Sequence, residues 1–284
     1  MLAATMGYSL KIKGHLYYLN TPKVMGILNL TPDSFFAESR CANTNDAIAK
    51  IDQMCCDGMD ILDIGAVSTR PGTDLPSQEE EWRRIKNPLK EIVKHFPKLI
   101  ISIDTFRADI AQKCVEEGAD IINDISGGTY DDNMLHTVAR LQVPYILMHI
   151  QNRPENMQQN PTYEHVTTDL IRYFAQRVEL AYQTGVHDII IDPGFGFGKT
   201  IEHNYRLLSD LKDFKIFKAP ILVGLSRKSM LWKPLNGRPE DMLNATSIVN
   251  TLALTQGAHI LRVHDVKPAA ECIKIYQYFR ESQN

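Results

Sequence analysis

The chain has 284 residues, of which 44% are hydrophobic and 23% are charged, and its net charge is −3. These values are ordinary for a globular protein, and they do not favour a nucleic-acid partner, because binding to a phosphate backbone needs a basic surface. The sequence has no run of about eighteen apolar residues, so we expect no membrane segment.

The cysteines and the N-terminus predict a cytoplasmic protein. The five cysteines lack the C-x-x-C and zinc-finger spacings, and they stand at positions 41, 55, 56, 114 and 272. An odd set of this kind is typical of reduced thiols rather than of a disulfide framework. The first residues carry no cationic segment ahead of an apolar stretch, so we expect no signal peptide.

Alternating character around Gly14 predicts a short β-hairpin at about residues 8–20. Strand-like runs and helical patterns then alternate to the end of the chain. The expected strands are 24–29, 60–65, 100–104, 120–123, 144–148, 188–192, 220–224 and 259–263. The expected helices lie near 44–57, 78–95, 107–117, 131–141, 161–184, 202–213, 240–256 and 267–281.

Eight strands alternating with eight helices imply an α/β fold, a closed (β/α)₈ TIM barrel over about residues 22–282. Several helical patterns end at a glycine just before the next apolar run, as at Gly58, Gly118, Gly185 and Gly257. An open doubly wound sheet is the alternative, but it would usually show fewer units and a glycine-rich first turn. The chain shows no linker, so we expect a single domain over 1–284.

The most informative stretch is 189–199, which reads Ile-Ile-Ile-Asp-Pro-Gly-Phe-Gly-Phe-Gly-Lys. Asp192 stands where a buried strand ends, and in a TIM barrel such a carboxylate faces the mouth where active sites lie. The alternative is that Asp192 is a turn residue in a tight connection. The segment also approaches a Walker A loop, but Pro193 replaces its first glycine and offers no backbone N–H, which excludes a P-loop nucleotidase.

Polar side chains gather at the predicted strand ends, which share one mouth in a barrel. Four of them would form a polar floor: Asn29, Asp104, Asn123 and Asp192. Lys228 and Arg262 would lie beside this floor as cations, and Arg70 and Arg227 would stand on loops. Asp124 is expected to be structural.

The polar floor predicts the chemistry of the ligand. The two oxygens of Asp192 suit a flat ring with adjacent N–H and NH₂ donors, and Asn123 can donate and accept in the same plane. A planar Arg262 can stack on the ring. Arg262 and His264 face the same way on the last strand, near the usual phosphate site of this fold. A flat heterocycle with a phosphorylated arm is therefore expected.

Seven motifs in order carry a resemblance to a known family. They occupy residues 25–35, 68–72, 102–105, 122–128, 192–199, 226–229 and 262–266. Together they closely resemble the signatures of the dihydropteroate synthase family, over about residues 22–280. The sequence differs from the usual family pattern at 36–39, 66–67 and 152–154, all in expected loops.

The resemblance implies a folate-pathway transferase that joins 4-aminobenzoate to 7,8-dihydropterin-6-ylmethyl diphosphate and needs Mg²⁺. By similarity, the pterin site would be Asp104, Asn123, Met148, Asp192, Phe197 and Lys228. The diphosphate site would be Asn29, Arg262 and His264, with Asn29 as the Mg²⁺ ligand. The 4-aminobenzoate site would be Phe35, Thr69, Arg70, Pro71, Lys228 and Ser229. Asp104, Lys228 and Arg262 would be catalytic, and the resemblance suggests a homodimer through the last helices.

Two other functions are compatible with the polar floor. A pterin-binding methyltransferase of the corrinoid type shares it but does not need the motifs at 68–72 and 226–229, which are both present. Loss of Asn29, Lys228 or Arg262 would favour a non-catalytic pterin-binding paralogue, and none of the three is lost.

Overall fold

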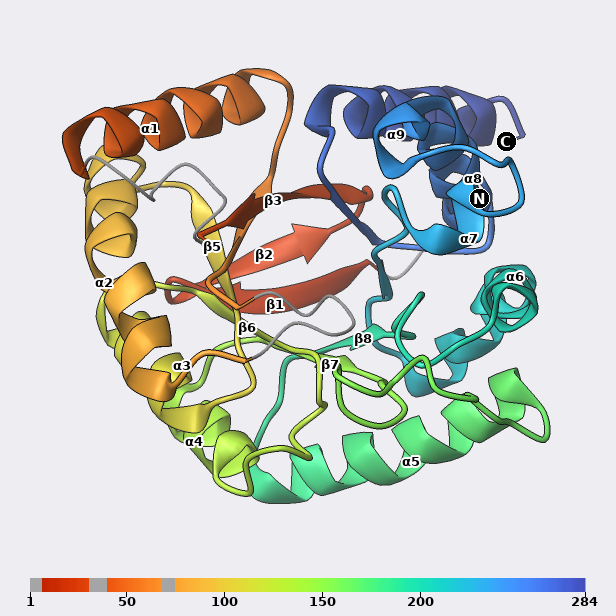
Figure 1. Cartoon of the computed structure of the whole chain (residues 1–284), viewed down its shortest axis with the longest axis horizontal. Coiled ribbons are helices and arrows are strands. Elements are labelled where there is room, and N and C mark those ends of the chain that lie inside the picture. The colour runs from red at the N-terminus through yellow and green to blue at the C-terminus, as the bar shows by residue number, and fades with distance from the viewer. Residues whose placement is uncertain (1–6, 31–39, 68–74, 284) are drawn as a thin grey trace.

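The computed structural model describes residues 7–30, 40–67 and 75–283, with backbone only for 40–44. A central set of strands is surrounded by helices (Figure 1). The strands are β1 Tyr8–Ile12, β2 His15–Leu19, β3 Lys23–Asn29, β4 Ile61–Gly65, β5 Ile100–Asp104, β6 Ile121–Asp124, β7 Tyr145–Met148, β8 Ile189–Asp192, β9 Leu222–Val223 and β10 Ile260–Val263.

The α-helices of the described residues follow these strands in turn. They are α1 Arg40–Cys56, α2 Gln78–His95, α3 Ala108–Glu116, α4 Met134–Leu141, α5 Val166–Thr184, α6 Ile201–Ser209, α7 Ser229–Trp232, α8 Leu243–Thr255 and α9 Val266–Glu281. Two 3₁₀ helices, Leu211–Phe217 and Pro239–Asp241, lie between them. None of the described helices combines the length and apolar character needed to cross a membrane.

The strands β3 to β10 form one parallel sheet in the order β8-β7-β6-β5-β4-β3-β10-β9. The two edge strands meet through a single bridge between Ile191 and Ile221, which nearly closes the ring and confirms the expected TIM barrel. This seam is narrow because β9 is shorter than the expected strand 220–224. Pro220 has no N–H to offer the ladder, and the N–H of Ile221 donates to Nδ1 of His259 at 3.1 Å.

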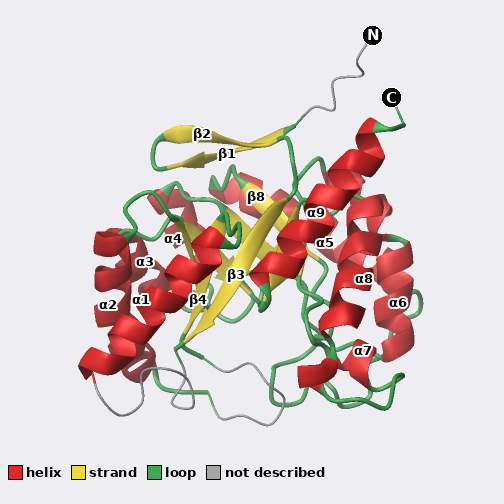
Figure 2. Cartoon of the chain, turned by 90° about the horizontal axis from the view of Figure 1, so that it is seen from above, coloured by secondary structure: helices red, strands yellow, loops and turns green. Residues whose placement is uncertain are grey.

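The predicted hairpin is confirmed as β1 and β2, which pair from Tyr8↔Leu19 to Ile12↔His15. It lies across one end of the barrel (Figure 2). Its buried side chains Leu10, Ile12 and Leu19 pack against the first inward layer of the barrel, to which each strand contributes one residue. That layer consists of Met25, Ile61, Ile100, Ile121, Ile146, Ile190, Leu222 and Ile260. The hairpin therefore closes the N-terminal end of the barrel with an apolar plug.

Several element boundaries differ from the sequence prediction. The helix expected at 161–184 begins only at Val166, and the one expected at 202–213 is divided into α6 and a 3₁₀ helix. The short helix α7 was not in the predicted list. The glycine stops were predicted correctly, because Gly58, Gly118, Gly185 and Gly257 all have φ between 96° and 107°, which favours glycine.

Candidate active site

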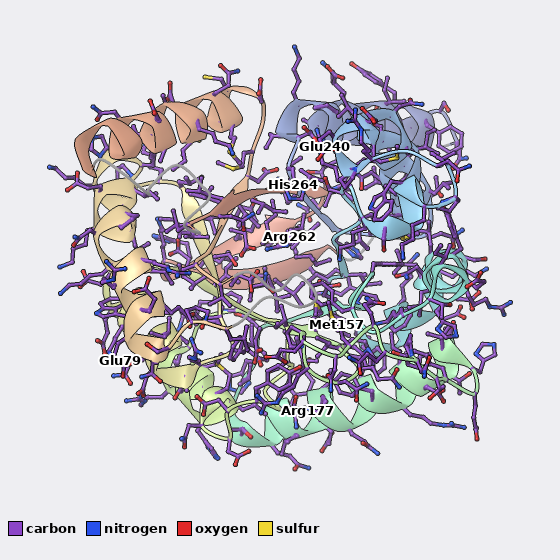
Figure 3. All side chains as sticks on the ribbon, in the orientation of Figure 1. Glu79, Met157, Arg177, Glu240, Arg262 and His264 are labelled. Atoms are coloured by element: carbon purple, nitrogen blue, oxygen red, sulfur yellow. The ribbon has the colours of Figure 1, made fainter. Side chains whose placement is uncertain are left out.

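Strand periodicity brings the predicted floor together at the end of the barrel away from the hairpin. Side chains alternate along a strand, so the positions two residues beyond the apolar layer also face inward. These positions include Asp63, Asn123, Asp192 and Arg262, contributed by four different strands. Figure 3 places Arg262 over the centre of the ring of helices. The inward layers thus change from apolar to charged towards the mouth.

Arg262 joins two carboxylates across the mouth. Its Nε donates to Oδ2 of Asp63 at 2.7 Å, and an Nη donates to Oδ2 of Asp104 at 2.8 Å. Asn123 also donates to Oδ2 of Asp63, at 3.2 Å. The guanidinium plane is therefore fixed on one edge by two acids, which leaves its face available for stacking.

Asp63 was missed by the sequence analysis, although it connects two of the predicted residues. It is fully buried, and its Oδ1 accepts no hydrogen bond from the described residues. Ser102, which pairs with Asp63 in register on the next strand, has a similarly unpartnered buried hydroxyl. Buried polar atoms are normally satisfied, so these two atoms would take their partners from a bound ligand or from ordered water.

The carboxyl of Asp104 has a pKa close to neutral pH. Its pKa is raised to about 7, mainly by burial; the Arg262 guanidinium opposes this rise, and the nearby Asp63 adds to it. The charge of Asp104 therefore depends on its neighbours, and it should respond to any charged group that enters the mouth.

Asp192 presents a free edge to the mouth. Its Oδ1 accepts the N–H of Gly194 at 2.8 Å, while none of the described residues donates to Oδ2. Burial raises the pKa of this carboxyl, and Lys228 opposes that rise. The side chain is only 6% exposed, so an incoming donor pair would meet it in a largely water-free setting.

Lys228 reaches across from the loop that follows β9. Its ammonium donates to the carbonyl of Phe195 and lies 4.5 Å from the centroid of the Phe197 ring. Burial lowers the pKa of Lys228 to about 8, and Asp192 opposes that fall. The cation is therefore held by a carbonyl and an aromatic face, beside the carboxylate of the polar floor.

An apolar wall completes the slot beside these charges. Met148, Phe106 and Ile125 form a buried cluster against which Phe197 packs. Met148 and Phe197 were predicted here, whereas Phe106 and Ile125 were not. Charged groups on one side and an apolar wall on the other suit a flat heterocycle.

The residues predicted for the diphosphate lie at the rim of the mouth. Asn29 ends β3 and is exposed, and its Oδ1 lies 3.6 Å from where a Cβ on Gly65 would stand. Nδ1 of His264 lies 3.0 Å from Oγ of Ser226. Within the described ranges, no group of three or more His, Cys, Asp or Glu side chains is placed to hold a metal.

The predicted 4-aminobenzoate site is only partly within the described structure. Ser229 is the first residue of α7 and directly follows Lys228. Phe35, Thr69, Arg70 and Pro71 lie outside the described residues.

Two other residues considered in the sequence analysis, Arg227 and Asp124, make hydrogen bonds to other groups of the protein. Arg227 makes a two-point ion pair with Asp265, at 2.8 and 2.9 Å, and also donates to the carbonyls of Pro239 and Glu240. Asp124 accepts hydrogen bonds from Ser126, Gly128 and Tyr145, which agrees with its expected structural role.

Comparison with known families gives one match over most of the barrel. Residues 25–264 match the family described as "Pterin binding enzyme". This range includes the four residues of the polar floor as well as Lys228, Arg262 and His264.

Full-length relatives and solved structures agree with this match. The chain is 40% identical to dihydropteroate synthase of Escherichia coli K12 and 37% identical to that of Haemophilus influenzae, covering 91% of this chain and 92% and 94% of the relatives. A Yersinia pestis dihydropteroate synthase, solved as a sulfonamide drug complex, superposes with a TM-score of 0.90 at 37% identity, covering 96% of this chain and all of the other. A Xanthomonas albilineans enzyme solved with 4-aminobenzoic acid has a TM-score of 0.89 at 34% identity, covering 97% and 99%.

Proposed function

The chain belongs to the pterin-binding enzyme family and has dihydropteroate synthase activity, and on this premise we propose how its barrel mouth binds and joins the two substrates. The reaction transfers a dihydropterin-methyl group from diphosphate to the amine of 4-aminobenzoate. The observation that supports the assignment of residues best is the Asp63–Arg262–Asp104 cluster, with Asp192 beside it.

The dihydropterin is proposed to lie flat between the apolar wall and Arg262. Asp192 would accept from the ring N–H and NH₂ through its free edge, and Asn123 would bond the ring from the neighbouring side. Met148 and Phe197 would cover one face of the ring, and Lys228 would donate to an acceptor on the ring. The uncovered face of the guanidinium supports the stacking role of Arg262.

The charges of the slot match the charge changes of the reaction. Cleavage of the C–O bond leaves positive charge on the electron-rich dihydropterin and negative charge on the departing diphosphate. Asp104 and Asp192, which are held in a largely buried slot, stabilise the positive charge on the dihydropterin. Arg262 and His264 stabilise the negative charge on the departing diphosphate at the rim. The aniline nitrogen attacks without a strong base, because it is already a nucleophile at neutral pH.

We propose that Mg²⁺ binds at Asn29 together with the substrate diphosphate. An amide oxygen is a ligand of the hard type that Mg²⁺ prefers, and Mg²⁺ commonly takes few protein ligands and several from phosphates and water. When bound, the ion would neutralise charge on the leaving diphosphate. Asn29 is exposed at the strand end and can reach such a shared ion.

Replacing Asn29 with alanine should raise the Mg²⁺ concentration for half-maximal rate by about tenfold, because the protein's own ligand is lost while substrate ligands remain. The measurement is the initial rate against Mg²⁺ at saturating substrates. Asn133→Ala is the matched control, since Asn133 is exposed and makes no capping hydrogen bond on α4. Equal Mg²⁺ dependence in both variants would show that Asn29 is not the ligand.

The 4-aminobenzoate is proposed to bind at the outer rim, framed by Lys228 and Ser229 together with the predicted residues Phe35, Thr69, Arg70 and Pro71. The superposed Xanthomonas albilineans enzyme binds 4-aminobenzoic acid, which supports such a site.

One assay separates this function from the two alternatives. Purified protein is incubated with dihydropterin diphosphate, Mg²⁺ and 4-aminobenzoate, and dihydropteroate and diphosphate are followed together. Both products should appear in equal amounts and cease on addition of EDTA. Pterin binding without products would instead indicate a corrinoid-type methyltransferase or an inactive paralogue.

We also propose a homodimer formed through the last two α-helices, which pack against each other (Figure 1). Large apolar side chains on them are exposed, namely Ile248, Leu252, Ile275, Tyr278 and Phe279. An exposed apolar group of this kind is typical of a protein interface.

Ile275→Glu should weaken the dimer by about 100-fold or more, because a buried interface would enclose an unpaired charge from each copy. Analytical ultracentrifugation over a range of concentrations measures this. Leu180→Glu on α5 is the control, since Leu180 is similarly exposed but lies away from these helices. A wild-type chain that stays monomeric would contradict the proposal.

The remaining proposals concern organisation and location. We propose that hairpin and barrel form one domain, because Leu10, Ile12 and Leu19 complete the core of the barrel. A cytoplasmic location, expected from the cysteine pattern, also remains a proposal.

A further inference from the structure

Lys199, the lysine of the segment that approaches a Walker A loop, is buried. Lys199 is only 3% exposed, and its ammonium lies 2.9 Å from the carbonyl of Gly194 and 3.0 Å from that of Phe197. Its third close partner is Nδ1 of His149, also at 3.0 Å. A longer contact at 3.4 Å reaches the carbonyl of His149, so protein acceptors surround the amine and satisfy it without water.

These contacts fasten the turn that carries Phe195 and Phe197 onto the end of β7. A Cβ on Gly194 would stand 2.0 Å from the carbonyl oxygen of His149, and one on Gly198 would stand 2.7 Å from that of Gln151. Both glycines have positive φ, 69° and 61°. The backbone therefore approaches the neighbouring loop too closely for any other residue, and Lys199 bridges both segments at this contact.

The fastened turn provides both contacts of Lys228. The carbonyl of Phe195 accepts its N–H, and the ring of Phe197 lies under its ammonium. Neither contact would keep its place if the turn shifted, because both groups belong to the segment 194–197, whose first and last carbonyls Lys199 binds. The cation of the pterin slot is therefore positioned by a second, fully enclosed lysine, whose pKa burial lowers well below the usual value.

We propose that Lys199 is a positioning residue of the transfer reaction, which holds the 194–198 turn so that Phe195 and Phe197 direct Lys228 into the pterin slot. This inference rests on the proposed site. Lys199 touches no substrate and acts only through the turn. His149, whose pKa is lowered well below its usual value by burial, is neutral and can accept at Nδ1.

Lys199→Met keeps the length of the side chain but removes its three donors. The dissociation constant for 6-hydroxymethyl-7,8-dihydropterin, measured by calorimetry, should rise about tenfold, and kcat/KM should fall about 30-fold, as a small misplacement of a binding group can cause. Lys233→Met is the control, since Lys233 is exposed, and its replacement should change neither value. Urea unfolding shows whether the variant is folded, and Lys199→Gln, which keeps two donors, should be intermediate.

A double-mutant cycle separates positioning from mere support of the fold. In a Lys228→Met background, Lys199→Met should change pterin binding by less than about threefold, because the main group it positions is already absent and only the contact of Phe197 with the ring can still shift. An undiminished tenfold loss in that background, or normal binding by a folded Lys199→Met, would overturn the inference. If Lys228→Met and Asp192→Asn also left binding unchanged, the proposed site itself would be wrong.

Discussion

Asp192→Asn should lower kcat/KM for the dihydropterin substrate by about 10³-fold, because two charge-assisted hydrogen bonds of about 1.5–3 kcal/mol each are lost. The asparagine would present an N–H to a ring edge that also carries donors. Calorimetric binding of 6-hydroxymethyl-7,8-dihydropterin should weaken in parallel, since the lost contacts are made in the bound ground state.

The same substitution should not destabilise the fold. Burial raises the pKa of Asp192 in the folded protein above its value in the unfolded chain. The free energy of unfolding therefore falls as the pH rises from the unfolded pKa through the folded pKa, because the buried carboxyl must ionise. Asparagine removes that cost, so the urea midpoint at pH 8 should equal or exceed that of the wild type.

Asp188→Asn is the matched control for this prediction. Asp188 directly precedes β8, at the hairpin end, where it accepts the N–H of Lys11 at 2.8 Å, and the amide oxygen of asparagine can replace it. Turnover in this variant should stay within about twofold of wild type, as expected for a conservative change remote from the slot. Normal turnover by Asp192→Asn would show that the floor has been assigned wrongly.

The barrel and the meeting of its polar strand ends were predictable because both follow from simple periodicity. Strand ends of a parallel barrel share one mouth, so Asp104, Asn123 and Asp192 had to converge once the strands were identified. The structure places them there, and their roles in binding remain predictions.

Asp63 was missed because it lies within a strand instead of at its end. The run Ile61–Gly65 is apolar except for its central residue, Asp63. Polar site residues were expected only at strand ends, so Asp63 was not considered. Strand periodicity could have identified Asp63, because it stands two residues before Gly65 and therefore faces inward on the same side of the strand. An acid inside a buried strand needs a partner, and only the fold shows that this partner is Arg262.

Lys199 and the hairpin show a different limit of sequence reasoning. The pattern that excluded a P-loop left Lys199 without a role, because its acceptors are backbone carbonyls, which no sequence pattern marks. The hairpin was predicted from its alternation, but its place depends on three side chains fitting the apolar end of the barrel. The contact of Lys199 with His149 and the packing of the hairpin both join segments far apart in the chain.

Arg262→Met should abolish turnover and also destabilise the protein, by about 3–5 kcal/mol at pH 8, because two acids lose their shared cation in a buried setting. Asp63 is fully buried, and Arg262 is its only cationic partner among the described ion pairs. Urea unfolding and steady-state rates measure the two effects. Arg238→Met is the control, since Arg238 is largely exposed and pairs with Asp241 at the surface.

The pH dependence identifies the cause of this loss. The pKa of Asp104 is already raised to about 7, and removal of Arg262, which lowers it, raises it further. An acid with a raised folded pKa loses stability as pH rises from its unfolded value of about 3.9, so the variant should recover stability relative to wild type between pH 8 and pH 5.5. Adding Asp63→Asn should restore stability at pH 8 without restoring turnover, because it removes the repulsion but not the need for a cation at the diphosphate. A stability loss independent of pH and unrelieved by Asp63→Asn would mean that Arg262 supports the barrel by packing alone.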